Sequence, residues 1–355
     1  MLEPTAAVQS LKQYHPPLGG RLGLRFDFNE NTAGCSPHVL ARLRQISAED
    51  LARYPEREPV QAAVAQWLGV EPARVLLTNG VDEGIHLLAE TFLESGAEAL
   101  VVVPTFSMYE IYAAATGARV HTVQAEEDFS FPLHRVLDRI TPATRLIAIA
   151  NPNNPTGAVA PREALLEIAE AAPHAAVLVD EAYYDFYGRS VLADIERLPN
   201  LFVARTFSKA YGMAGLRAGV LVGNPLHIGF VKRVASPYNV NAVALACLPE
   251  AIRDKEYIAA YVADVRRNRA RLQSELEALG LPYWKSEANF VLVRAGAARE
   301  AFVSSMRDCG ILVRDRDRDP GCAGCVRITV GTEEQTNVLV RALRYIVGKS
   351  AEVSA

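Results

Sequence analysis

The sequence predicts an α/β protein with a mostly parallel central sheet sandwiched by helices, followed by a smaller α+β lobe. The first observation is an alternation, from about residue 74, of short β-branched runs with amphipathic stretches. The second is that these runs are apolar on both faces, as are the strands of a parallel sheet that helices cover. The third is a change beyond about residue 235, where one long helical stretch precedes several short strands.

The elements of the central sheet follow one another at short intervals. The expected strands are RVLLT (74–78), ALVVV (99–103), RVHTV (119–123), RLIAIA (145–150), AAVLVD (175–180), LFVART (201–206) and AGVLVG (218–223). The expected helices are VDEGIHLLAETFL (81–93), FSMYEIYAAAT (106–116), the stretch around PLHRVLDRI (132–140) and PREALLEIAEAA (161–172). Parallel sheets bind ligands beyond the carboxyl ends of their strands, so a site is expected among the polar residues that follow each run.

The C-terminal lobe has a different order of elements. Residues 255–280 read as one long helix ending at Gly280, and a closing helix is expected over 332–348. Between them, strands are expected at NFVLVRA (289–295), GILVRD (310–315) and CVRITVG (325–331). The first 35 residues are rich in Pro and Gly and are expected to be irregular. We therefore expect an arm (1–35), a large domain built on the central sheet (36–235) and a small C-terminal domain (236–355).

Composition excludes several classes of protein. The chain has 355 residues, is 50% hydrophobic and carries a formal charge of −4, so we expect no affinity for nucleic acid or acidic membranes. Its apolar runs fall far short of the roughly 20 residues that span a bilayer. The first residues lack the order of a secretory signal, which leads us to expect a cytoplasmic protein. Five scattered cysteines make no disulfide framework.

Two further patterns receive ordinary interpretations. CAGC (322–325) is a single cysteine pair, whereas zinc needs about four ligands, so we expect two loop cysteines and no metal. RDRDRD (314–319) alternates in sign and is expected to be a solvated loop.

Four strand ends carry polar residues of complementary kinds. These ends are LLTNGVDEG (76–84), NPNNPTG (151–157), VLVDEAYYDF (177–186) and RTFSKAYGMAGLRAG (205–219). Each alone has an ordinary explanation, such as a common turn, a helix N-cap at Asp180 or an exposed Lys209. Together they supply a helix start for an anion, a hydrogen-bond donor, a carboxylate, an amine and, in Arg217, a second cation. Those are the parts that a pyridoxal phosphate site requires.

Three of these segments carry a family resemblance. With NPNNPTG, DEAYYDF and TFSKAYGMAGLRAG, the chain resembles the fold-type I pyridoxal-phosphate enzymes of the aminotransferase class I/II family. Within that family it is most similar to the histidinol-phosphate aminotransferases. The similarity extends from NEN (29–31) to VRITVGT (326–332), which is nearly the whole chain.

The resemblance implies roles around the cofactor ring. Lys209 is expected to bind the cofactor aldehyde covalently and then to move the proton between the substrate Cα and the cofactor. Asp180 is expected to pair with the protonated ring nitrogen. Asn154 and Tyr183 are expected to donate to the ring oxygen, with Asn153 as the alternative to Asn154.

It also implies how the ring face and the phosphate are bound. Phe106 is expected to stack on the ring, its alternative being a core aromatic. The groups expected to hold the phosphate are Arg217, the hydroxyls of Thr206 and Ser208, and the backbone N–H groups of Val81 and Asp82. Tyr54 matches a tyrosine that reaches the phosphate of the neighbouring subunit, which implies a homodimer with shared active sites. A surface role for Tyr54 remains the alternative.

The resemblance places the substrate near a pair of arginines. Arg327 and Arg314 match the residues that hold the substrate anion, and two arginines around one anion favour a phosphate over a carboxylate. A structural role for Arg314 stays open. Tyr14 matches an arm tyrosine that reaches the substrate, and Asn29 lies where the arm enters the pocket.

The implied reaction transfers an amino group between L-histidinol phosphate and 2-oxoglutarate, a small-molecule donor and a keto-acid acceptor, in histidine biosynthesis. The alternatives are an aromatic-amino-acid aminotransferase, a threonine-phosphate decarboxylase and a catalytically silent cofactor-binding regulator. DFNENTAG (27–34) is more similar to the histidinol-phosphate group than to the decarboxylases, and no basic helix-turn-helix segment supports a regulator.

Overall fold

The structure is a computed structural model that describes residues 2–15, 20 and 22–354. In this part of the chain the larger sheet has seven strands, in the spatial order β2-β8-β7-β6-β5-β3-β4. They are β2 (Val75–Thr78), β3 (Glu98–Val103), β4 (Arg119–Gln124), β5 (Thr144–Ala150), β6 (Ala176–Asp180), β7 (Leu201–Thr206) and β8 (Gly219–Val222). β8 is antiparallel to both neighbours and the remaining pairs are parallel, which confirms the mostly parallel sheet predicted from the sequence.

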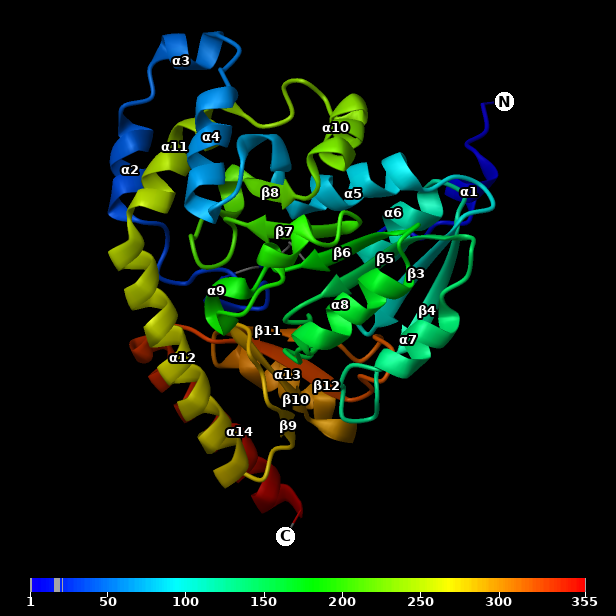
Figure 1. The fold of residues 1–355 in the computed structure, drawn as a ribbon. Helices are drawn as coiled ribbons and strands as arrows, with labels where there is room; N and C mark the ends of the chain where they lie inside the picture. Colours follow the sequence, from blue (N-terminus) through cyan, green and yellow to red (C-terminus); the bar gives the residue numbers. More distant parts are fainter. Residues whose placement is uncertain (1, 16–19, 21, 355) are drawn as a thin grey trace.

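Helices cover both faces of this sheet (Figure 1). One face carries α5 (Gly80–Phe92), α6 (Met108–Ala115) and α10 (Pro225–Val234), and the other carries α7 (Leu133–Arg139) and α8 (Arg162–Ala171). Successive strand residues point to opposite faces. In β6, Leu178 belongs to the apolar cluster that contains Ile85 of α5, whereas Val177 and Val179 belong to the cluster that includes α8. β6 is therefore buried on both sides, as its apolar run predicts, whereas the edge strand β4 is largely exposed.

A second sheet lies beside the first and joins distant parts of the chain. Its order in the described residues is β1-β11-β12-β10-β9. Its strands are β1 (Leu24–Phe26), β9 (Tyr283–Trp284), β10 (Phe290–Arg294), β11 (Ile311–Asp315) and β12 (Cys325–Thr329). Two long helices, α12 (Lys255–Ala278) and α14 (Glu333–Ser354), pack against each other, and α13 (Arg299–Asp308) packs on β11 (Figure 1).

The remaining α-helices come from the first third of the chain, except for the short α9 and for α11, which packs against helices of that third. They are α1 (Ala6–Gln9), α2 (Pro37–Arg44), α3 (Ala48–Ala52), α4 (Glu58–Leu68), α9 (Tyr184–Tyr187) and α11 (Ala242–Arg253). α11 packs on α2 and α4, so the chain after residue 235 first returns to the large-sheet side before α12 enters the second sheet's lobe (Figure 1). Within the described residues, no helix is both long and apolar enough to cross a bilayer.

The N-terminal arm is less irregular than the sequence suggests. Residues 24–26 form β1, which pairs in parallel with β11 from the far end of the chain. Gly23 allows this pairing: its φ is +102°, and a Cβ there would lie 2.2 Å from the carbonyl oxygen of Gly310. Three residues are too few to give a strand signal, and the pairing partner is almost 290 residues away. Residues 16–19 and 21 of the arm lie outside the described part.

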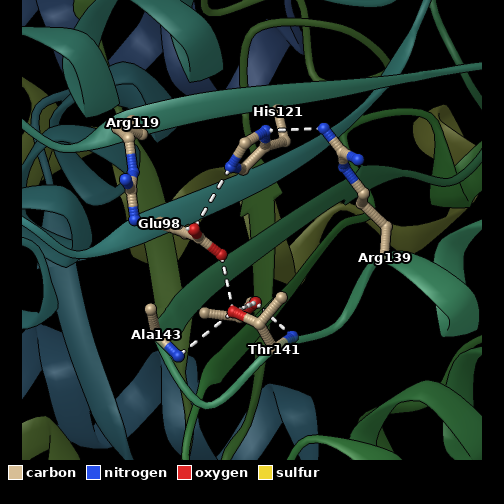
Figure 2. Close-up of polar contacts among 7 residues, drawn as sticks. Glu98, Arg119, His121, Arg139, Thr141 and Ala143 are labelled. Carbon is tan, nitrogen blue, oxygen red and sulfur yellow. Dashed lines mark hydrogen bonds and ion pairs between the residues drawn. The ribbon is translucent and has the colours of Figure 1, made fainter.

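Polar groups anchor the amino ends of the parallel strands, on the edge opposite the strand ends that carry the predicted site (Figure 2). The Glu98 carboxylate, buried at the start of β3, accepts a hydrogen bond of 2.6 Å from the Thr141 hydroxyl. It also forms an ion pair of 2.9 Å with Arg119 and lies 3.4 Å from Nε2 of His121, and Arg139 lies 3.0 Å from Nδ1 of that histidine. These contacts tie β3, β4 and the turn before β5 together.

Candidate active site

A cavity lies at the carboxyl ends of the parallel strands, where the sequence predicts the site. It encloses about 650 Å³ of atom-free space, its open mouth included. Ten of the residues predicted to hold a cofactor line it: Val81, Asp82, Phe106, Asn154, Asp180, Tyr183, Thr206, Ser208, Lys209 and Arg217. Segments that are distant in the sequence therefore meet here because each one follows a neighbouring strand.

Two glycines make room for one end of the cavity. α5 begins at Gly80, whose φ is +76°, and a Cβ there would lie 2.5 Å from the Arg217 guanidinium. A Cβ on Gly219 would lie 2.7 Å from the backbone nitrogen of Val81. Only residues without a side chain let β8 and the helix start approach this closely.

Arg217 stands at this end beside the start of α5. Its guanidinium donates to the Asp82 carboxylate at 2.8 Å and to the Ser208 hydroxyl at 3.4 Å. The Thr206 hydroxyl lines the same end and accepts from the Ser208 N–H at 3.1 Å. A helix start, a guanidinium and two hydroxyls form a set of donors that suits a phosphate group.

Asp180, the last residue of β6, is a buried carboxylate at the other side of the cavity. The Tyr109 hydroxyl donates to its Oδ2 at 2.6 Å, and the Ala182 N–H donates to its Oδ1 at 3.0 Å. Burial raises the pKa of Asp180 to about 6, against the lowering effect of these two donors. A carboxylate in this setting favours a cationic partner.

Lys209 extends into the same cavity from the segment after β7. Its Nζ donates to the carbonyl oxygen of Phe28 at 3.0 Å and lies 5.9 Å from the centre of the Tyr183 ring. Burial, followed by the nearby Arg327 cation, lowers the pKa of Lys209 to about 8. A substantial fraction of this amine is therefore neutral near pH 8, as a nucleophile or a base requires.

Three further side chains link the cavity to the arm. The amide of Asn29 donates to the Tyr183 hydroxyl at 2.9 Å, and the side-chain oxygen of Asn154 accepts from Arg327. The amide of Asn153 instead donates to the Pro104 carbonyl after β3 at 2.8 Å and to the Thr156 hydroxyl of its own loop at 2.9 Å. Of the two asparagines that the sequence left as alternatives, Asn154 lines the cavity.

The arginines that the sequence assigns to a substrate lie next to this edge of the cavity. Arg327 is buried and donates to the Asp27 carbonyl at 2.6 Å, and Arg314 donates to the Tyr14 hydroxyl at 3.2 Å. Burial, followed by the Arg316 and Arg314 cations, lowers the pKa of Arg327 to about 9. Nε of Arg327 and Nη1 of Arg314 are buried with no hydrogen-bond partner among the described residues. The buried, unpartnered nitrogens and the mutual repulsion of the Arg327, Arg314 and Arg316 cations favour binding of an anion here.

Several residues depart from the sequence-based interpretation. Arg316, expected in a solvated loop, has only 12% of its side chain exposed and is ion-paired with Asp319. Cys322 lies in the turn before β12, as expected, whereas Cys325 is the first residue of that strand; both are fully buried. Among the described residues there is no group of three or more potential metal ligands.

Tyr54 does not line the cavity of its own chain: it is 76% exposed and stacks on Tyr238 with ring centres 4.1 Å apart.

Sequence reasoning missed Tyr109, which lines the cavity and contacts Asp180. A signal existed, because Tyr109 lies three residues after Phe106 at the start of a helix that follows a strand end. A tyrosine in an amphipathic helix is usually a core residue, and its partner is 71 positions away.

Comparison with known proteins identifies the family of the chain. Residues 23–343 match the family described as Aminotransferase class I and II. The chain is 37% identical over 336 residues to the histidinol-phosphate aminotransferase of Roseobacter denitrificans, covering 92% of each protein, and 35% identical to histidinol-phosphate aminotransferase 1 of a Nostoc species, covering 96% and 97%. Its fold resembles the crystal structure of the Sinorhizobium meliloti histidinol-phosphate aminotransferase in complex with pyridoxal-5′-phosphate, with a TM-score of 0.88, 27% identity and 98% of each chain covered. The chain belongs to the class I and II aminotransferase family.

Proposed function

We propose that the protein is a pyridoxal-phosphate-dependent histidinol-phosphate aminotransferase, which transfers the amino group of L-histidinol phosphate to 2-oxoglutarate to give imidazole acetol phosphate and L-glutamate. The observation that carries the proposal is that Lys209 and Asp180 line one cavity with the donors that suit a phosphate. The relatives of the same name support the choice of substrate.

The residues of the cavity fit pyridoxal phosphate in both charge and position. When bound, this cofactor supplies an aldehyde that takes up the amino group and a ring that accepts electrons. Asp180, as an anion, holds a proton on the ring nitrogen, and Phe106 packs against the ring face. Asn154 and Tyr183 donate to the ring oxygen. Arg217, Thr206, Ser208 and the first turn of α5 hold the phosphate.

Lys209 is the proton carrier in this proposal. Its lowered pKa of about 8 leaves the amine partly neutral near pH 8, so it would be able to bind the cofactor aldehyde and to move a proton at the substrate Cα. The carbonyl of Phe28 accepts a hydrogen bond from the amine and orients it, whereas burial and then the cation of Arg327 reduce its basicity. The same base serves both halves of the reaction, which gives a ping-pong cycle.

Arg327 and Arg314 hold the anionic end of the substrate, with Tyr14 and Asn29 beside them. The unpartnered nitrogens of the two arginines support an incoming anion with several acceptor oxygens. A phosphate has three such oxygens and a charge near −2, whereas a carboxylate has two oxygens and a charge of −1. The excess positive charge of the cluster favours the phosphate.

Half-reactions with L-histidinol phosphate, phenylalanine, tyrosine and threonine phosphate test the substrate assignment. We expect histidinol phosphate to convert the cofactor to its amino form most efficiently, and Arg314→Leu to lower kcat/KM for it by about 100-fold, the loss expected for one charge-assisted pair. The cofactor absorbance of the variant should not change. A preference for phenylalanine would contradict the substrate assignment, and release of carbon dioxide from threonine phosphate would indicate a decarboxylase.

We also propose a homodimer in which Tyr54 reaches the phosphate of the partner's cofactor. The exposed Tyr54–Tyr238 pair supports this, because two adjacent exposed aromatic rings form an apolar surface of the kind that marks protein interfaces. A mixture of Lys209→Ala and Tyr54→Ala chains provides the test. If the sites are shared, each mixed dimer contains one fully intact site and one site with both changes. Activity should then exceed that of either variant alone, and no recovery on mixing would contradict shared sites.

A further inference from the structure

Asp180 is held by a tyrosine from a helix outside the sheet. The Tyr109 hydroxyl, in the first turn of α6, donates to Oδ2 at 2.6 Å, and the backbone N–H of Ala182 donates to Oδ1 at 3.0 Å. Tyr109 and Asp180 are 1% and 5% exposed. Each carboxylate oxygen thus has one fixed donor, and the acceptor capacity that remains is available to the cavity.

The other charged groups near Asp180 oppose its ionisation. Asp82 of α5 and the neighbouring Glu181 are both acidic and raise the pKa of Asp180. Each of them has its own cation, since Arg217 lies 2.8 Å from Asp82 and Arg205 lies 2.9 Å from Glu181. Neither arginine donates a hydrogen bond to Asp180 in the described structure.

Tyr109 is a permanent donor in this setting. Burial and the adjacent Asp180 carboxylate raise the pKa of Tyr109 well above its ordinary value, so its hydroxyl keeps its proton over the working range of an enzyme. The other phenol nearby, Tyr183, interacts with Asn29 instead. A donor that cannot ionise and cannot turn to water stabilises the charged form of its acceptor.

We propose that Tyr109 is a positioning residue that orients the Asp180 carboxylate and keeps it ionised, and thereby sets the lowest pH at which the protein binds its cofactor. This inference rests on the proposed function. A protonated Asp180 and a protonated ring nitrogen cannot share one hydrogen bond, so below the pKa of Asp180 a proton must leave when the cofactor binds. The affinity for the cofactor then falls about tenfold for each unit by which the pH lies below that pKa.

Tyr109→Phe removes only the hydroxyl and keeps the ring that packs against Phe106. A charge-assisted hydrogen bond of this kind shifts the carboxylate's titration by about one to two pH units. We expect the dissociation constant of pyridoxal phosphate, measured by equilibrium titration of the cofactor-free protein from pH 5 to 9, to keep its value at pH 9. At pH 6 it should rise about 5- to 50-fold, for a shift of one to two units from a pKa near 6. Tyr112→Phe is the matched control, because it removes a hydroxyl one turn further along α6, where the ring stacks on His86.

A second measurement uses no cofactor. The infrared carboxyl band of Asp180, assigned by its loss in Asp180→Asn, should titrate near pH 6 in the wild-type protein and one to two units higher in Tyr109→Phe. Unchanged titration and binding in that variant would overturn the proposal while leaving the function in place. A wild-type Asp180 still protonated at pH 8 would overturn it even if the variant does not fold. A wild-type protein that binds no pyridoxal phosphate would instead overturn the proposed function.

Discussion

Asp180→Asn should stabilise the cofactor-free protein while it removes activity. In the folded chain, burial raises the pKa of Asp180 to about 6 from its ordinary value of 3.8. A shift of about 2 units corresponds to about 3 kcal/mol, because each unit is worth about 1.4 kcal/mol. Above pH 6 the wild-type protein carries that penalty, because it folds around an ionised carboxylate whose intended partner is the cofactor.

The direction of the pH dependence follows from the raised pKa. The stability that a protonated Asp180 contributes is fully present below pH 4 and is lost as the pH rises through about 6. Asparagine cannot ionise, so the variant lacks this dependence. Asparagine has only one oxygen, so its NH₂ group either faces the Ala182 N–H or replaces the oxygen that accepts from Tyr109. Either orientation loses one hydrogen bond, at a cost of about 1 kcal/mol at any pH. The net gain at pH 8 should therefore be about 1–2 kcal/mol, and the variant should be less stable than the wild type at pH 4.

Urea unfolding of the two cofactor-free proteins, at equal protein concentration, measures the difference at each pH. We compare the difference between the two unfolding free energies at pH 8 with the same difference at pH 4, because the constant hydrogen-bond loss then cancels. We expect this difference to change by about 3 kcal/mol between the two pH values. A stability difference that varies by less than about 0.5 kcal/mol over this range would refute the claim that Asp180 is buried as an anion without a cationic partner. In the same variant with cofactor, we expect turnover to fall by at least about 100-fold.

Two further predictions concern other parts of the fold. Glu98→Gln should lower the thermal midpoint at pH 7 and have little effect near pH 3. The Thr141 hydroxyl, the leading cause, the His121 hydrogen bond and the Arg119 cation lower the pKa of Glu98, and the resulting stability is lost as the pH falls through that lowered pKa (Figure 2). An equal effect at both pH values would contradict this prediction. Gly219→Ala should destabilise the protein by about 1–3 kcal/mol and weaken phosphate binding, since its Cβ meets the start of α5. Gly229→Ala is the control, because this glycine lies in the open middle of α10, and it should stabilise the protein by about 0.5–1 kcal/mol. If calorimetry found equal effects of the two substitutions, the close approach of Gly219 to the start of α5 would be refuted.

The sequence predicted the elements that build the sheet and the side chains that follow them. Buried parallel strands leave an unambiguous pattern. Asp180 ends such a strand, Lys209 follows another, and Arg217 lies just before the antiparallel strand β8. Because parallel strands end at one edge, local order in the sequence was enough to bring these residues into one cavity.

Contacts that depend on tertiary packing were beyond the sequence. β1 pairs with a strand almost 290 residues away and is too short to be recognised alone. Tyr109 has the pattern of a core helix residue, and only the packing of α6 on the sheet brings it to Asp180. Arg316 lies in a segment whose charges alternate in sign, a pattern typical of solvated loops. Its side chain is nevertheless largely buried, where it forms an ion pair with Asp319.

The central claim is that Lys209 binds the cofactor aldehyde covalently, and borohydride reduction tests it most directly. The protein is incubated with pyridoxal phosphate, reduced, digested and analysed by mass spectrometry, with Lys12, Lys232, Lys255, Lys285 and Lys349 as internal references. We predict one reduced cofactor per chain, on the peptide that contains Lys209, and no label in Lys209→Ala. Label on another lysine, or none on the wild-type protein, would contradict the account.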